Sequence, residues 1–154
     1  ERMIRERLTS MNHTLGLAES CTGGRIADRL TDIPGASGYL RGCIVCYHED
    51  VKKELLHVAP ETIRDRHVVS EPVAVEMAAG VKRALKADYG FGITGLLGPD
   101  DDDGIRAGTV CIAITDGQKT DSVTCHFLHD RQGNKEEAAR AGMWMIWKFI
   151  NKKT

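Results

Sequence analysis

The sequence predicts an α/β fold. Apolar runs of strand length alternate with segments whose apolar residues recur at helical spacing, and helical segments stand at both ends. Asp116-Gly117 between two of the runs adds an antiparallel hairpin. The 154 residues suit one domain, so we treat 1–154 as a single unit.

The first half of the chain is expected to open with an amphipathic helix over 1–12, because Met3, Ile4, Leu8 and Met11 recur at helical spacing. Thr14-Leu15-Gly16-Leu17 has the length and content of a buried strand, which we place at 14–18. The segments that follow are a helix over 22–31, a loop over 34–38, a strand over 39–47, a helix over 51–56 capped by Asp50, and another near 61–66 starting at Pro60.

In the second half, Ser70 is a favourable N-cap for a helix over 71–86, which carries apolar residues at four-residue steps. The last helix is expected over 134–150, where apolar residues again recur at helical spacing. Between these helices we expect a glycine-rich strand over 89–94, a long loop over 95–108, and strands over 108–115 and 120–128.

The composition is that of an ordinary globular protein, with 42% hydrophobic residues, 28% charged residues and a formal net charge of -1. This balance gives no support for a nucleic-acid or membrane partner, and no apolar run approaches the roughly 20 residues that span a bilayer. The chain opens without an initiator Met and without the apolar centre of a signal peptide, as a trimmed chain or a fragment of a longer one would. We expect a cytoplasmic protein.

The five cysteines are expected to be reduced thiols, four of them in or beside apolar strand-like runs. Cys43 and Cys46 lie three residues apart within one such run, so their side chains should point to opposite faces of a strand rather than converge on a metal. The histidines have no metal-ligand spacing. We expect neither a metal nor another cofactor.

The segment Ala18-Glu19-Ser20-Cys21-Thr22-Gly23-Gly24 lies between an expected strand and an expected helix. Such a turn can bind an anion at the helix N-terminus and presents Ser20, Cys21 and Thr22 as possible nucleophiles. The alternative is a structural turn in which Ser20 or Thr22 caps the helix and the glycines permit close packing.

Ser20, Tyr47 and Thr94 each stand at the carboxyl end of an expected strand. If these strands are parallel neighbours, their loops converge on one crevice, which is where open α/β sheets bind ligands. Lys52 could reach this crevice and act as the base for a serine. Arg131 and Lys135 could clamp a phosphate. The run Asp100 to Asp103 is interpreted as a solvated turn rather than a cation site.

Taken together, these segments resemble the CinA C-terminal domain family, the nicotinamide-nucleotide amidohydrolases, over most of the chain from about Thr14 to Ile150. The resemblance rests on Ala18 to Gly24, Leu30 to Ser37, Arg41-Gly42, Tyr47 with Lys52, Glu54 to Leu56, Val69 to Glu71, Thr94-Gly95, Gly98-Pro99, Gly108 to Val110, and Asp130-Arg131. It implies a three-layer α/β/α sandwich with a mixed, largely parallel central sheet. It also implies hydrolysis of nicotinamide mononucleotide, a small-molecule nucleotide, to nicotinate mononucleotide and ammonia.

The family pattern also implies roles for individual residues. Ser20 would be the nucleophile, Lys52 its base and Tyr47 an orienting or relaying group. The substrate-binding residues would be Thr22, Gly23, Gly24, Thr94, Gly95, Arg131 and Lys135, with the turn holding the oxyanion or the phosphate. A homodimer is expected, with Trp144 and Trp147 on the last helix as a candidate surface.

Two stretches depart from the family pattern. His48-Glu49-Asp50 stands where the family usually has a small residue, Asn and Glu, and Asp101 to Asp103 fill a loop that is normally glycine-rich, with Ala107 in place of a proline. Such carboxylates would repel a phosphate unless they point away or bind the positive pyridinium. A degenerate paralogue that binds a nucleotide or a protein partner without catalysis is therefore the alternative.

Overall fold

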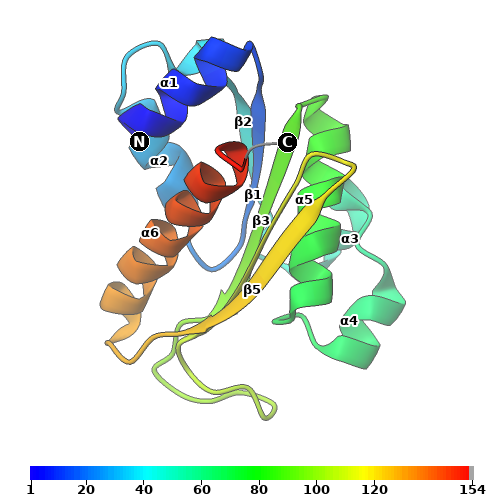
Figure 1. The fold of residues 1–154 in the computed structure, drawn as a ribbon. Helices are drawn as coiled ribbons and strands as arrows, with labels where there is room; N and C mark the ends of the chain where they lie inside the picture. The colour runs from blue at the N-terminus through cyan, green and yellow to red at the C-terminus, as the bar shows by residue number, and fades with distance from the viewer. Residues whose placement is uncertain (153–154) are drawn as a thin grey trace.

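The computed structural model describes residues 1–152, which form a five-stranded sheet between two layers of helices (Figure 1). The strand order is β2-β1-β3-β4-β5, in which β2, β1 and β3 run parallel while β4 and β5 add antiparallel pairs. The strands are β1 (Leu15–Glu19), β2 (Leu40–Val45), β3 (Tyr89–Leu96), β4 (Thr109–Thr115) and β5 (Thr120–His126). The expected mixed α/β/α sandwich is confirmed, with the parallel strands gathered in one half of the sheet.

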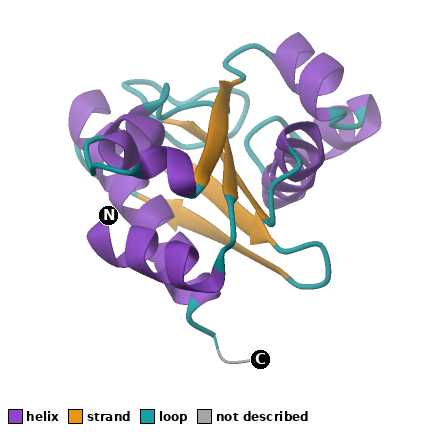
Figure 2. Ribbon diagram, turned by 90° about the horizontal axis from the view of Figure 1, so that it is seen from above, coloured by secondary structure: helices purple, strands orange, loops and turns teal. Residues whose placement is uncertain are grey.

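The helices divide between the two faces of the sheet, as the view from above shows (Figure 2). One face is covered by α1 (Arg2–Met11), α2 (Arg25–Thr31) and α6 (Arg131–Ile150), and the other by α3 (Glu49–Leu56), α4 (Pro60–Arg66) and α5 (Glu71–Leu85); a 3-10 turn, η1 (Ala36–Gly38), precedes β2. Helix α5 packs directly on β3, because a Cβ added to Gly90 would lie only 2.0 Å from the Ala78 carbonyl oxygen. No helix within residues 1–152 is long and apolar enough to cross a membrane.

Side-chain caps explain where three of the helices begin, two of them at residues other than the expected ones. Helix α5 begins as expected, since the Ser70 hydroxyl accepts a hydrogen bond from the Val73 amide at 3.4 Å. Helix α3 begins at Glu49 because His48, and not Asp50, is its N-cap. Helix α6 begins at Arg131 rather than 134, because the Asp130 carboxylate accepts from the Gly133 amide at 2.8 Å. Because Asp130 is the N-cap, Arg131 lies in the first turn of α6.

The cysteines are free thiols on both sides of the sheet, and the two tryptophans lie on α6. All five cysteines are free; Cys43 packs against the core on one side of the sheet and Cys46 belongs to the core on the other. On α6, the rings of Trp144 and Trp147 stack with centroids 4.9 Å apart, and Trp144 is exposed. The expected dimer surface on α6 stays a prediction.

Candidate active site

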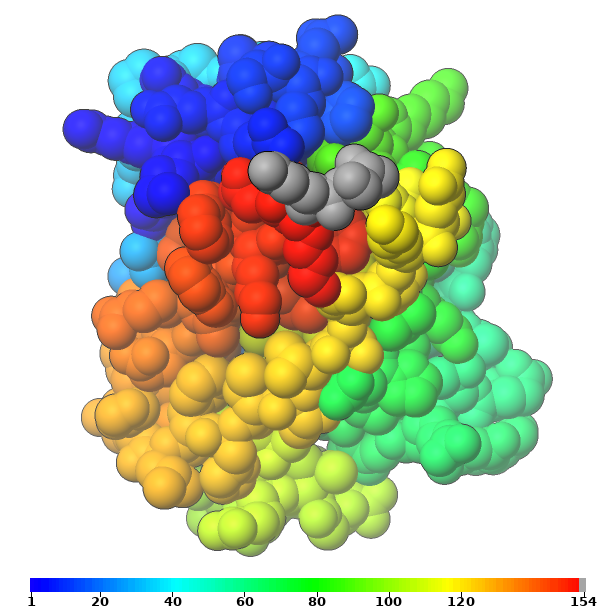
Figure 3. Space-filling model, in the orientation of Figure 1, coloured from blue at the N-terminus to red at the C-terminus, as the bar shows by residue number. Residues whose placement is uncertain are grey.

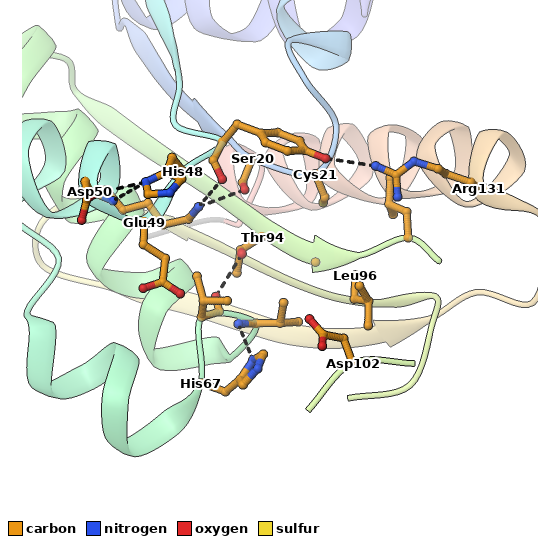
Figure 4. Close-up of a pocket in the computed structure, with 16 residues that line it drawn as sticks. Ser20, Cys21, His48, Glu49, Asp50, His67, Thr94, Leu96, Asp102 and Arg131 are labelled. Atoms are coloured by element: carbon orange, nitrogen blue, oxygen red, sulfur yellow. Dashed lines mark hydrogen bonds and ion pairs between the residues drawn. The ribbon is translucent and has the colours of Figure 1, made fainter. Parts of the chain in front are cut away.

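The loops after three parallel strands converge on one cavity of about 440 Å³ (Figure 4). Ser20 follows β1, Tyr47 follows β2 and Thr94 lies near the end of β3, and all three residues line the cavity. The β2-β1-β3 pairing brings the carboxyl ends of these strands to the same edge of the sheet. The convergence expected from the sequence is therefore present.

At the floor of this cavity, Lys52 contacts Ser20. The Lys52 ammonium donates to the Ser20 hydroxyl oxygen at 3.1 Å and to the backbone carbonyl oxygens of Cys46 at 2.7 Å and Tyr47 at 3.3 Å. The Lys52 side chain is buried, and within residues 1–152 no carboxylate forms an ion pair with it. Burial without a counter-ion lowers the pKa of Lys52, which favours the neutral amine that a general base requires.

Helix α3 places Lys52 in the interior through its apolar face. Lys52 and Leu56 are the buried residues of this helix, one turn apart, whereas Lys53 lies at the surface and pairs with Asp50 at 3.0 Å. Two adjacent lysines thus have different environments, and only the one on the inner face reaches Ser20.

Tyr47 and Arg131 form a second contact at the rim of the cavity. One Arg131 nitrogen, Nη2, donates to the Tyr47 hydroxyl at 3.0 Å, and the other, Nη1, donates to the Gly98 carbonyl oxygen at 2.6 Å. Both partners are neutral, so the guanidinium charge is not compensated by them. Arg131 can therefore attract an anionic group of a ligand.

Four of the expected substrate-binding residues do not line this cavity: Thr22, Gly23, Gly24 and Lys135. The expected anion site at the glycine turn is wrong for Gly24, whose amide donates to the Glu19 carboxylate at 3.0 Å, and the Gly23 amide donates to the Ser20 carbonyl oxygen at 3.1 Å. Lys135 lies over Gly23 rather than beside Arg131 in the cavity; a Cβ on that glycine would be 3.3 Å from the Lys135 Nζ. Thr22 is buried, and its hydroxyl has no partner within residues 1–152.

The other three, Arg131, Thr94 and Gly95, do line the cavity. The Thr94 hydroxyl donates to the Val68 carbonyl oxygen at 3.0 Å, which joins β3 to the segment before α5. At Gly95 a Cβ would lie 2.8 Å from the Thr109 carbonyl oxygen and 3.1 Å from the Cys21 sulfur. The absence of a side chain there keeps the turn after β1 close to β3.

Comparison with known proteins identifies the relatives of this chain. A model of the CinA C-terminal domain matches residues 1–150. The chain belongs to this family. A crystal structure of a CinA superfamily protein from Enterobacter cloacae is 31% identical with a TM-score of 0.94, covering 97% of this chain and 89% of that one. A crystal structure of a competence or damage-inducible protein from Enterobacter asburiae also is 31% identical, with a TM-score of 0.94 and coverage of 97% and 95%.

The curated relatives are longer proteins. A CinA-like protein of Fervidobacterium nodosum is 37% identical over 151 residues, which are 97% of this chain and 37% of the relative. A CinA-like protein of Solibacter usitatus is 36% identical over 148 residues, with coverage of 96% and 36%. This CinA-family chain thus spans little more than a third of the length of these relatives.

The sequence did not single out Glu19, although it is the most thoroughly buried carboxylate beside the site. In this CinA-family chain its oxygens accept hydrogen bonds from the amides of Gly24 at 3.0 Å, Ile26 at 3.2 Å and Ala27 at 2.8 Å. Glu19 therefore replaces Ser20 and Thr22, the expected caps of α2, and Gly24 is the N-cap residue with φ 93°. The sequence signal that could have indicated this capping role is the position of Glu19, an acidic residue between an apolar strand and a helix N-terminus.

Asn134 is a second residue that the sequence did not indicate. It is buried, and its side-chain amide donates to the Leu97 carbonyl oxygen at 3.0 Å while its oxygen accepts from the His129 amide at 3.0 Å. Asn134 thereby fixes the first turn of α6 to the loop after β3. The same turn carries Arg131, so its position relative to the cavity depends on this contact.

The acidic loop lies at the lower edge of the molecule in Figure 3, and its four aspartates are exposed as expected. Asp101 accepts from the Ala107 amide at 2.8 Å, and Asp103 lies 3.7 Å from the imidazole of His67. Asp102 is exposed and also lines the cavity, which the sequence did not indicate. Within residues 1–152, no group of three or more His, Cys, Asp or Glu side chains is arranged to hold a metal ion.

Proposed function

We propose that this chain is a serine amidohydrolase that converts nicotinamide mononucleotide to nicotinate mononucleotide and ammonia. The observation that carries the proposal is the contact between the buried Lys52 amine and the Ser20 hydroxyl, 3.1 Å apart, in a cavity at the carboxyl ends of parallel strands. The substrate comes from the resemblance to the CinA C-terminal domain family, in which Ser20 and Lys52 match the motif residues.

In the proposed reaction, neutral Lys52 takes the proton of the Ser20 hydroxyl as the oxygen attacks the carboxamide carbon. The tetrahedral intermediate then collapses, and ammonia leaves with the proton held by Lys52. Water hydrolyses the resulting ester and restores Ser20. Lys52 is suited to both transfers, because burial lowers its pKa toward the range where a base also returns a proton readily.

The remaining residues have binding roles in this proposal. Arg131 would hold the phosphate, and Tyr47 would orient Arg131 through the 3.0 Å contact between hydroxyl and guanidinium. Thr94 and Gly95 would shape the wall against which the pyridine ring lies. Thr22 is buried and does not line the cavity, so the proposal gives it no contact with the substrate.

The direct test is release of ammonia from nicotinamide mononucleotide by the purified chain. Ammonia release that disappears in Ser20→Ala supports the proposal. The alternative, a paralogue that binds without catalysis, is favoured by the carboxylates of Glu49 and Asp102 at the cavity. Binding of the nucleotide without ammonia release would support that alternative.

Replacing Arg131 with alanine should raise KM for the nucleotide by about tenfold and lower kcat much less. Phosphate binding contributes about equally to the ground state and the transition state, so its loss affects mainly KM. Steady-state kinetics measure both constants. Arg140→Ala is the matched control, because Arg140 lies on the same helix, pairs with Glu137 at 3.0 Å and does not line the cavity. An unchanged KM in Arg131→Ala would exclude this phosphate position.

Replacing Cys21 with alanine should change kcat by less than about threefold, although Cys21 neighbours Ser20 and lines the cavity. Burial raises the pKa of its thiol to about 12, so the nucleophilic thiolate is scarcely populated near neutral pH. Initial rates of ammonia release check this expectation. A loss comparable with that of Ser20→Ala would instead make Cys21 the nucleophile.

A further inference from the structure

Charged groups of both signs line the cavity. Arg131 is positive, and its hydrogen-bond partners, the Tyr47 hydroxyl and the Gly98 carbonyl oxygen, are neutral. Three carboxylates line the same cavity: Glu49, Asp50 and Asp102. Asp50 pairs with Lys53 at 3.0 Å, Glu49 lies 3.9 Å from the same lysine, and within residues 1–152 Asp102 forms no ion pair. This leaves Glu49 and Asp102 as the carboxylates available to a ligand. A ligand that fills the cavity therefore meets both an anion-binding and a cation-binding wall.

The two carboxylates come from separate parts of the chain. Glu49 is the first residue of α3, one turn before Lys52, and Asp102 belongs to the loop after β3. In Figure 4 the two side chains flank Thr94, on the side of the cavity away from the contact between Tyr47 and Arg131. The charge of Glu49 also reaches Lys52, since it acts to raise the pKa of the amine that burial lowers. Glu49 thus acts on one of the reacting groups, and Asp102 lines the same cavity.

We propose that Glu49 and Asp102 select substrates whose ring is positively charged, by facing the pyridinium of the bound nucleotide. This inference rests on the proposed function, which supplies a substrate with a cationic ring and an anionic phosphate. Arg131 attracts the phosphate, and the two carboxylates attract the ring that carries the amide.

The opposed charges also explain how carboxylates are tolerated beside a phosphate site. A purely anionic ligand would be repelled by Glu49 and Asp102 wherever it lay in the cavity. A ligand with separated charges can place each end against the wall of opposite sign. The asparagine that the family usually has at the position of Glu49 would attract a cationic ring less than a carboxylate does.

The test compares two forms of one ligand by titration calorimetry: nicotinamide mononucleotide and its reduced form, which keeps the amide and the phosphate but has a neutral dihydropyridine ring. The native chain should bind the oxidised form more tightly. The double variant Glu49→Gln with Asp102→Asn should weaken binding of the oxidised form by about fivefold, as expected for two partly exposed charges, and leave the reduced form nearly unchanged. High salt should reduce the preference of the native chain.

Asp100→Asn is the matched control, because Asp100 belongs to the same exposed loop but does not line the cavity. It should leave the preference for the oxidised form unchanged. Equal affinity of the native chain for the two forms, a preference that persists in the double variant, or a complete lack of binding would overturn the inference. Ammonia release is measured on the same preparation; selective binding without ammonia release would defeat the proposed function and leave the ring-charge selection standing.

Discussion

Replacing Ser20 with alanine should lower kcat for ammonia release by a factor of about 10³ or more, because the variant lacks the oxygen that attacks the carboxamide. The fold should persist. The variant loses the hydrogen bond between Lys52 and the Ser20 hydroxyl, but Lys52 keeps its hydrogen bonds to the Cys46 and Tyr47 carbonyl oxygens. The measurement is the single-turnover and steady-state rate, with circular dichroism and thermal unfolding as tests of integrity.

The control for this variant is Cys21→Ala, which alters the next residue of the same turn. A folded Ser20→Ala protein with native activity would remove Ser20 from the mechanism. Loss of activity accompanied by loss of the native spectrum would require Ser20→Thr, which keeps a hydroxyl; partial activity there would support the role of the oxygen in catalysis.

Replacing Lys52 with methionine should lower kcat by a similar factor, about 10³, since no base then accepts the serine proton. Methionine keeps the length and apolar stem of the side chain, which suits the buried site. The matched control is Lys53→Met, which removes the same charge from the outer face of α3. Native activity in Lys52→Met would exclude Lys52 as the base.

The lowered pKa of Lys52 also sets the expected pH dependence. For activity, kcat/KM should rise with pH through the lowered pKa and then level off, because the neutral amine is the active form. For stability, the unfolded chain keeps the ordinary lysine pKa and so binds more protons between the two values; the free energy of unfolding therefore rises with pH across that window and is flat above it. Both slopes should be absent in Lys52→Met, and a pH-independent native rate would contradict the assignment.

Much of the fold and the centre of the site follow from local patterns in the sequence. Ser20, Tyr47 and Thr94 each end an apolar run, and parallel strands in an α/β sheet must present such ends at one edge. Lys52 lies one turn before Leu56 on the inner face of its helix, while Lys53 lies on the outer face, so helical periodicity separates the two lysines. These features could be predicted because they depend only on the spacing of residues along the chain.

Other features depend on which distant segments meet, and only the tertiary structure decided them. The Glu19 carboxylate, rather than a substrate anion, takes the amides at the start of α2, because the two-glycine turn folds the helix N-terminus back over it. Lys135 lies over Gly23, and Asp102 lines the cavity while Asp100 does not. Asp102 is on a loop, where no periodicity fixes the direction of a side chain. Glu19 and Lys135 are on a strand and a helix, but the partners they meet come from other segments, so the packing of the elements determines what they face.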